Sequence, residues 1–331
     1  MKNFDFGIRV EMGGKIGSGH FFRCLALAEE LKKRKKTVIF LSSNKKEIHD
    51  HLRKKFPYLV LEEKTENKKI QKCKELMNKI KFLIVDLPEN EEEYGIKLEN
   101  YGIALINDLG GIKIHSKILI NGSIVKKFHK YKIKNINTKS LIGPKYMLIR
   151  KEFVENRDKV KITKNPIKNI LLTFGGNDDA DITSKILLLL NDFNITIVLG
   201  PTNRNKQKIC KIIKNRSNTK LVINPKKIAS LFSKQDLIIS STGITIYELA
   251  CLGMPTIMIP INSAQKESSK EMEKNGFGEI VDLEKINQKK MKQILSKLDN
   301  YVHRKEMSRL GRKIMDGRGI ERITDILEKR I

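Results

Sequence analysis

Three short segments combine glycine with residue types that can bind an anion or move a proton. They read Ile-Gly-Ser-Gly-His-Phe-Phe-Arg at 16–23, Phe-Gly-Gly-Asn-Asp at 174–178 and Ser-Ser-Thr-Gly-Ile-Thr-Ile-Tyr-Glu at 240–248. Each follows an apolar stretch, which predicts a strand that ends in a tight turn and opens a helix. Such a turn presents backbone N–H groups and the positive end of a helix dipole to an anion. Because these turns occur in both halves of the chain, we expect a phosphorylated ligand held between two domains.

No one of these segments is specific by itself. Gly17 and Gly19 can take positive φ and let a ligand approach the backbone, but a plain strand-to-helix turn explains them equally well. The same two explanations apply to Gly175 and Gly176, which precede Asn177. The first segment lacks the third glycine of the dinucleotide fingerprint, and the chain has no Gly-Lys-Ser/Thr of a P-loop. Three such turns at three strand ends nevertheless favour a binding site.

The elements that would position these turns alternate along the chain. With 331 residues, 40% of them apolar, the chain is long enough for two domains. Helices are expected after Ser18, which is placed to cap the first one, and in the second half after Asp179, Asn205, Pro225, Thr245 and Ala264. Apolar, β-branched runs predict strands at 8–12, 37–41, 82–85, 104–106, 117–120, 170–173, 196–199, 221–223, 237–239 and 256–259.

This alternation predicts an α/β protein with two Rossmann-like, doubly wound domains. Parallel sheets of this kind place ligand sites at the carboxyl ends of their strands. A polar, Lys-rich stretch at 156–166 ends in Asn-Pro and predicts the boundary. We therefore expect an N-terminal domain of residues 1–155 and a C-terminal, nucleotide-binding domain of residues 156–331.

The net charge of +28 does not point to nucleic acid. Basic residues are spread through nearly every segment beside abundant Ile and Asn, as a codon bias would produce, and there is no Trp to stack on bases. No run of 18 apolar residues predicts a spanning helix, and the N-terminus does not resemble a signal peptide. Four cysteines without zinc-ligand spacing fit a reduced, cytoplasmic protein. Peripheral contact with anionic membrane surfaces stays open.

A resemblance becomes specific in the first segment, because Gly13–Arg23 (GGKIGSGHFFR) is similar to the N-terminal motif of the UDP-sugar hydrolases of pseudaminic acid biosynthesis. Those enzymes act on UDP-2,4-diacetamido-2,4,6-trideoxy-β-L-altropyranose and resemble the spore-coat polysaccharide protein SpsG. The resemblance covers essentially the whole chain. Further matches follow in the expected order at Val85-Asp86, Ile106–Asp108, Leu141–Arg150, Glu152-Phe153, Thr173–Asp178, Ser240–Gly253 and Asp316–Arg322.

The family implies a GT-B architecture, two Rossmann-like domains with a cleft between them, similar to the MurG glycosyltransferase. Two departures concern the ligand. Members often carry His-Tyr where this chain has Leu87-Pro88, and the tyrosine is thought to border the sugar. The turn after Ile239 is also less glycine-rich than in many relatives, so hydroxyls are expected to replace some bare backbone at the phosphates.

His20 is the expected catalytic residue. It sits in the first turn of a helix, where the positive dipole end disfavours the charged imidazolium. A neutral imidazole can accept a proton from water as that water attacks an anomeric carbon. The resemblance points to the same histidine as general base. Taken alone, a histidine at a helix start is more often a surface or capping residue.

Glu248 is the expected nucleotide ligand. The resemblance implies that its carboxylate accepts hydrogen bonds from both ribose hydroxyls, a task suited to a group that offers only acceptors. The plainer alternative is charge complementarity with a helix N-terminus. Four residues of the preceding turn are expected to hold the diphosphate: Ser241, Thr242, Gly243 and Thr245.

Five further side chains have more than one reading. Asp86 and Asp108 end strands and could orient His20, bind acetamido groups or sit as solvated turn residues. Arg23 either reaches a phosphate or is an ordinary charge on the helix surface. Asn262 and Gln265 could contact sugar or phosphate, although Gln265 could also simply begin a helix.

No HExxH motif occurs and the cysteines lack zinc-ligand spacing, so neither a metal nor a cofactor is expected. The leading hypothesis is an inverting nucleotide-sugar hydrolase, monomeric, with a UDP-sugar as its small-molecule partner. The alternative is a glycosyltransferase on the same fold, in which a sugar or lipid hydroxyl replaces water. A nucleic-acid or partner-binding module is disfavoured by the scattered charge.

Overall fold

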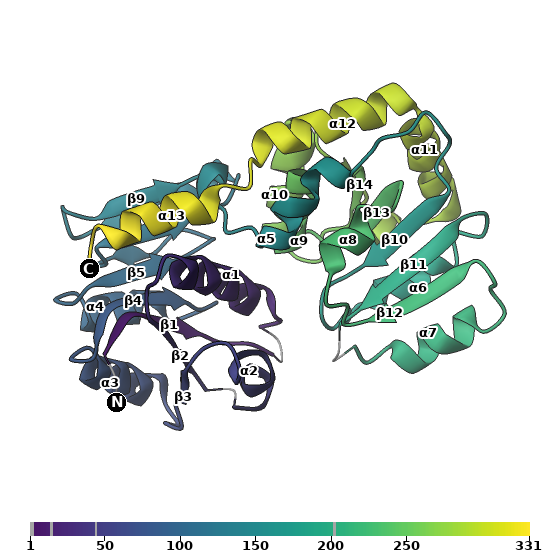
Figure 1. Cartoon of the computed structure of the whole chain (residues 1–331). Helices are drawn as coiled ribbons and strands as arrows, with labels where there is room; N and C mark the ends of the chain where they lie inside the picture. Colours follow the sequence, from purple (N-terminus) through teal and green to yellow (C-terminus); the bar gives the residue numbers. More distant parts are fainter. Residues whose placement is uncertain (1–2, 14–15, 44, 201–202) are drawn as a thin grey trace. The chain divides into compact units, whose positions relative to one another are not determined.

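The computed structural model describes residues 3–13, 16–43, 45–200 and 203–331. It divides into two compact units, which are described separately. Unit 1 contains Met1–Ile149 and Arg318–Ile331, and unit 2 contains Arg150–Gly317. Both are shown in Figure 1.

Unit 1 is built on a seven-stranded sheet with the order β3-β2-β1-β4-β5-β7-β9, and its strands pair in parallel. The strands are β1 (Phe4–Val10), β2 (Val38–Ser42), β3 (Tyr58–Val60), β4 (Ile80–Asp86), β5 (Ile103–Ile106), β7 (Ile118–Asn121) and β9 (Lys139–Ile142). A small parallel pair, β6 (Lys113–Ile114) and β8 (Lys132–Ile133), lies outside the main sheet.

Helices cover both faces of this sheet, because the buried strands are apolar on both sides. Phe6 and Ile8 of β1 point into a core shared with α1 (Gly19–Lys33), α2 (Lys45–Leu52) and α13 (Gly319–Glu328). Leu83 and Val85 of β4 point into a second core, shared with α3 (Glu66–Leu76) and α4 (Glu91–Lys97). Unit 1 is therefore a doubly wound α/β domain.

Unit 2 repeats this arrangement with a six-stranded parallel sheet of order β12-β11-β10-β13-β14-β15. Its strands are β10 (Asn169–Thr173), β11 (Asn194–Leu199), β12 (Thr219–Ile223), β13 (Leu237–Ser240), β14 (Thr256–Met258) and β15 (Glu279–Ile280). Its helices are α5 (Lys151–Asn156), α6 (Ile182–Leu187), α7 (Lys206–Ile213), α8 (Ile228–Phe232), α9 (Ile244–Leu252), α10 (Ser263–Lys274), α11 (Gln288–Asp299) and α12 (Tyr301–Ile314). The predicted pair of Rossmann-like domains is confirmed.

The units divide the chain differently from the predicted boundary at 155/156. Residues 150–155 belong to unit 2, and the last 14 residues, 318–331, return to unit 1. The reason is the apolar face of α13, whose Ile320, Ile323 and Leu327 are buried in the core beneath α1. Arg34 at the end of α1 reinforces this contact by pairing with Asp325 and Glu328.

Every predicted strand is present, with its ends shifted by a few residues. The strands that the sequence analysis did not identify are short or weakly apolar, such as β9 with the sequence Lys-Ser-Leu-Ile. Ser18 occupies the N-cap position of α1 as expected, but its side chain makes no capping hydrogen bond.

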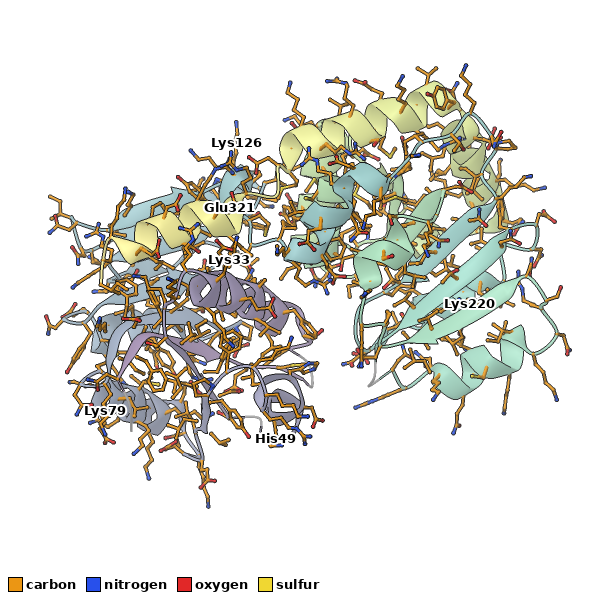
Figure 2. All side chains as sticks on the ribbon, viewed as in Figure 1. Lys33, His49, Lys79, Lys126, Lys220 and Glu321 are labelled. Carbon is orange, nitrogen blue, oxygen red and sulfur yellow. The ribbon has the colours of Figure 1, made fainter. Side chains whose placement is uncertain are left out.

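Lysine side chains project from many elements (Figure 2): Lys33 ends α1, Lys126 begins a 3-10 helix of unit 1, and Lys220 lies in β12.

Candidate functional site

The predicted site residues gather at the same topological position in each unit. In both sheets the strand order reverses beside the first strand, between β1 and β4 in unit 1 and between β10 and β13 in unit 2. Ligands of doubly wound sheets bind outside the carboxyl ends of the strands at this reversal. His20 follows β1 and Asp86 ends β4, and the three glycine-rich turns follow β1, β10 and β13.

In unit 1 this position holds a hydrogen-bonded pair, His20 and Asp86. The two residues are 66 apart in sequence, but Asp86 pairs in register with Val10, just before the loop that leads to His20. His20 Nδ1 lies 2.7 Å from Asp86 Oδ1. The Asp86 side chain is fully buried, while that of His20 keeps 22% of its surface exposed. Of the three alternatives for Asp86, the geometry supports the orientation of His20.

The charge state of Asp86 fixes the tautomer of His20. Burial alone would raise the pKa of Asp86, but the positive charge of Arg23 and the hydrogen bonds from Arg23 and His20 lower that pKa well below its usual range. An ionised carboxylate only accepts hydrogen bonds, so the 2.7 Å contact requires the proton on Nδ1. With this proton on Nδ1, Nε2 is the nitrogen that can act as a base when the ring is neutral, and it has no hydrogen-bond partner among the described residues.

Arg23 is not an ordinary charge on the helix surface. Its side chain is buried rather than on the helix surface, and its guanidinium bonds the two Asp86 oxygens through Nε and Nη2, each at 2.6 Å. Nη1 bonds Asp108 at 2.6 Å. With these bonds, Arg23 holds Asp86 in place. The Cys24 thiol adds a fourth donor to Asp86, at 3.2 Å.

Glu91 is a buried carboxyl near this pair that was not among the predicted site residues. It accepts a hydrogen bond of 3.2 Å from Asn107. Burial, followed by the negative charge of Asp86, raises the pKa of Glu91 to about 6. It lies in an acidic run of residues 89–93, and nothing in the sequence separates it from its exposed neighbours.

The first glycine-rich turn matches the prediction in part. Gly17 has φ of +73° with nothing near the position of a side chain, as expected for a backbone open to a ligand. Gly19, however, is the first residue of α1 and does not take positive φ, so its conformation does not require glycine. Gly14 and Lys15 of the family motif lie outside the described residues.

The turn after β10 combines an open and a packed glycine. Gly175 has φ of +77° and open space around it. Gly176 lies against Gly200 so closely that a side chain on Gly200 would sit 2.5 Å from the Gly176 carbonyl oxygen. Asn177 is partly exposed beside them, and the next residue, Asp178, caps α6 through the N–H groups of Ile182 and Thr183. Only part of this turn is therefore free for a ligand.

The turn after β13 is held together from within. Thr242 donates its N–H to Gln265 Oε1 at 3.1 Å, and its hydroxyl accepts from Ser269 at 2.9 Å. Asn262 caps α10 by accepting from the N–H of Gln265 at 2.9 Å. Thr242, Gln265 and Asn262 are thus engaged in shaping the turn, and Gln265 lies in the first turn of α10, in line with the alternative that it begins a helix.

What this turn exposes is the start of α9. Gly243 is its N-cap residue without a side-chain cap, and Gly243 and Thr245 are partly exposed, whereas Ser241 is buried. The first N–H groups of a helix lack partners inside the helix and carry the positive end of its dipole. This end of α9 can therefore accept an anion.

Glu248 lies one turn into α9 and is nearly buried, with 3% of its side chain exposed. Both carboxylate oxygens accept hydrogen bonds from Arg150: Nε to Oε1 at 2.6 Å and Nη2 to Oε2 at 2.9 Å. Arg150 ends one of the family motifs in the sequence, but its pairing with Glu248 was not predicted.

Three further findings concern the surroundings of these residues. A surface depression of about 590 Å³ in unit 2 is lined by residues of α10, β15 and α11, and no predicted site residue lines it. Among the described residues, no group of three or more His, Cys, Asp or Glu side chains could hold a metal ion. None of the described helices is long and apolar enough to span a membrane.

Comparison with known proteins gives the same fold and a consistent set of relatives. Residues 153–316 match the Glycosyltransferase family 28 C-terminal domain. The chain is 26% identical to the spore coat polysaccharide biosynthesis protein SpsG of Bacillus subtilis in an alignment of 339 positions, gaps included, which covers 97% of each chain. It is also 26% identical over 280 residues to the UDP-2,4-diacetamido-2,4,6-trideoxy-beta-L-altropyranose hydrolase of Campylobacter jejuni, covering 81% of this chain and 96% of that enzyme.

Coverage differs among the relatives. An uncharacterized protein of Methanocaldococcus jannaschii is 29% identical over 268 residues, but the chain spans only 55% of its length. Among solved structures, MurG of Acinetobacter baumannii superimposes with a TM-score of 0.67 at 16% identity, covering 98% of this chain and 99% of MurG. The chain is thus a homologue of SpsG and of the Campylobacter hydrolase, and its two units have the GT-B fold of MurG.

Proposed function

We propose that this protein hydrolyses a UDP-linked diacetamido-trideoxy sugar in the cytoplasm, in the synthesis of a pseudaminic-type acid or a surface polysaccharide. The observation that carries the proposal is the 2.7 Å contact between His20 and the buried, ionised Asp86. It leaves His20 Nε2 as a fixed acceptor of a proton. Homology with SpsG and with the Campylobacter hydrolase supports a UDP-sugar as substrate.

In the proposed reaction, water attacks C1 of the sugar from the face opposite UDP. His20 Nε2 takes the proton of this water as the new C–O bond forms. The C1–O bond to the diphosphate breaks, and its electron pair leaves with UDP, so the sugar is released with inverted configuration. Asp86 stabilises the imidazolium that forms and keeps the ring in one orientation, in the way that a buried aspartate supports a catalytic histidine elsewhere. Arg23 and Cys24 hold Asp86 in place.

Unit 2 is proposed to bind the nucleotide. The exposed start of α9, with Gly243 and Thr245, suits the diphosphate because the helix dipole favours an anion there. Gly175 offers open backbone at the neighbouring strand end. Glu248 is proposed to accept hydrogen bonds from the ribose. Sugar selection would fall to unit 1, where Leu87-Pro88 replaces the His-Tyr pair often found in the resembled hydrolases.

A glycosyltransferase is the second candidate, and a specific observation favours it. The matched family model is a glycosyltransferase domain, and the fold of MurG covers 98% of this chain. A transferase would use the same His20 base on the hydroxyl of an acceptor. The two candidates differ only in what His20 deprotonates, so they are separated by whether turnover needs an added acceptor.

The test is a panel of UDP-linked diacetamido and N-acetyl sugars with EDTA and no acceptor. We expect UDP release from one or a few of them, with inversion at C1 in the NMR spectrum of the fresh product. The His20→Asn variant should bind UDP normally and lose turnover, because the base acts mainly in the transition state. Release that appears only after a lipid or sugar hydroxyl is supplied would establish the transferase instead. Turnover of His20→Asn within about tenfold of wild type would rule out the base.

A further inference from the structure

Three of the family motifs meet around α9 in unit 2, although they are far apart in the sequence. The first ends at Arg150, which bonds Glu248 of the second. The third brings Gly317 so close to Val154 and Cys251 that a side chain on Gly317 would lie 2.7 Å and 3.0 Å from their atoms. The proposed reaction assigns no role to Arg150, and its contact with Glu248 suggests one.

Glu248 needs Arg150 because it is the acidic residue of a buried, apolar helix. A carboxylate without a partner is strongly disfavoured in such a place. Arg150 supplies two parallel N–H donors, the side-on arrangement that fixes both the position and the plane of a carboxylate. The hydrogen bonds of 2.6 Å and 2.9 Å leave Glu248 one orientation.

Arg150 is itself held on its other sides. Its Nη1 bonds Glu152 Oε1 at 3.2 Å, and its guanidinium carbon lies 4.7 Å from the centre of the Phe153 ring. Glu152 also accepts from the N–H of Ala229 at 3.1 Å, and Phe153 packs edge-on against Phe232, so both residues are tied to α8. The guanidinium is therefore fixed before any ligand arrives.

A carboxylate has about four acceptor positions, two on each oxygen, and Arg150 occupies one on each. No other described residue donates a hydrogen bond to these oxygens, so one position on each remains, which matches two neighbouring hydroxyls of one sugar. With 3% of its side chain exposed, Glu248 leaves water little room to replace a hydroxyl that the ligand lacks. A fixed, poorly hydrated acceptor pair discriminates strongly against a ligand with one hydroxyl missing.

We propose that Arg150 is a positioning residue that sets the Glu248 carboxylate to accept from the vicinal 2′- and 3′-hydroxyls of a ribonucleotide, so that the pair selects ribo- over 2′-deoxyribonucleotides. The inference rests on the proposed binding of UDP by unit 2. It adds a specificity that neither Glu248 alone nor the start of α9 would provide.

The experiment compares UDP with 2′-deoxy-UDP by calorimetry on the whole chain. Wild type should bind UDP more tightly by about tenfold to a hundredfold, the range for a hydrogen bond to a charged group. Arg150→Lys keeps the charge but loses the two parallel donors, so the preference should fall below about threefold. Arg309→Lys is the matched control: Arg309 makes the same two-bond contact with Glu306, at 2.8 Å and 2.6 Å, but its side chain is 60% exposed. This control should leave the preference unchanged.

The outcomes separate the inference from the proposed function. Wild type that binds neither nucleotide would contradict the proposed function. Suppose that wild type binds UDP. If Arg150→Lys then weakens the binding of both nucleotides equally, or of neither, the role of Arg150 is overturned. If Arg150→Lys fails to fold in thermal unfolding, the double variant Arg150→Met/Glu248→Gln removes both charges together. It should fold and bind both nucleotides with a ratio near one, and a retained preference for UDP would overturn the inference.

Discussion

The Asp86→Asn substitution tests the proposed histidine–aspartate pair most sharply, because it keeps the shape of the side chain and removes its charge. Asp86 accepts four hydrogen bonds, from His20, from two nitrogens of Arg23 and from the Cys24 thiol. An asparagine offers one oxygen and one NH₂ group. In either orientation of the new amide, its NH₂ group faces two of these four donors and cannot accept a hydrogen bond from them.

The expected loss of activity follows from the two orientations. With NH₂ toward His20, Nδ1 must accept, so the proton moves to Nε2 and the base is lost. With NH₂ toward Arg23 Nε and Cys24, His20 keeps its partner but loses the negative charge that stabilises the imidazolium. We expect kcat for UDP release to fall by about 10²–10⁴-fold, in line with the effect of the same change in a histidine–aspartate pair elsewhere.

The free energy of unfolding should fall as well, because Arg23 pairs with the carboxylates of Asp86 and Asp108 and the substitution removes the first. Removing one partner of a buried ion pair costs about 3–5 kcal/mol. Asp108 still bonds Arg23 at 2.6 Å, so we expect the lower end of that range in denaturant unfolding. UDP affinity should not change, since the proposed nucleotide residues lie in unit 2.

Asp108→Asn is the matched control for this variant. Asp108 also bonds Arg23, but it makes no hydrogen bond to His20 within the described part of the chain, and its side chain is 31% exposed. It should lower kcat by less than about tenfold. A folded Asp86→Asn protein with kcat within tenfold of wild type would refute the role assigned to Asp86. An equal loss of kcat in Asp86→Asn and Asp108→Asn would show that the loss arises from disturbing Arg23, which both residues bond, rather than from His20.

Three further predictions concern stability, each measured by urea unfolding. The pKa of Glu91 is raised to about 6, against 4.5 for a free glutamate. Wild type should therefore lose about 2 kcal/mol of stability relative to Glu91→Gln as pH rises from about 4.5 to 6. A stability difference that does not change with pH would contradict this. Ile323→Ala should cost about 2–5 kcal/mol because the side chain is fully buried beneath α1, whereas Ile331→Ala at the chain end should cost little. Gly319→Ala should be strongly destabilising, since its new methyl group would lie 2.1 Å from the backbone oxygen of Met147; wild-type stability would show that the backbone yields there.

The sequence predicted the architecture because the strands of parallel sheets are continuous apolar runs, which are visible locally. It also located the turns at the strand ends, since these depend on glycine and helix-start residues within a few positions. The C-terminal helix was assigned to the wrong unit because its apolar face does not say which core it joins.

The pairings within the site could not be predicted in the same way. Arg23 and Asp86 lie 63 residues apart, and Arg150 and Glu248 lie 98 apart. Both pairs depend on the order of strands in the sheets, which sequence periodicity does not reveal. Thr242 and Gln265 have the residue types of phosphate ligands, but they satisfy one another instead. Glu91 could be recognised as part of the site only from its burial near Asp86 in the structure.

The central claim is that His20, oriented by Asp86, directs water to C1 of the sugar. Turnover in ¹⁸O-labelled water, without any acceptor, tests this claim directly. Mass spectrometry should find the label in the released sugar and none in UDP, because the C1–O bond is the one that breaks. Label in UDP would place the attack on phosphorus, and absence of turnover without an added hydroxyl acceptor would show that water is not the substrate of His20.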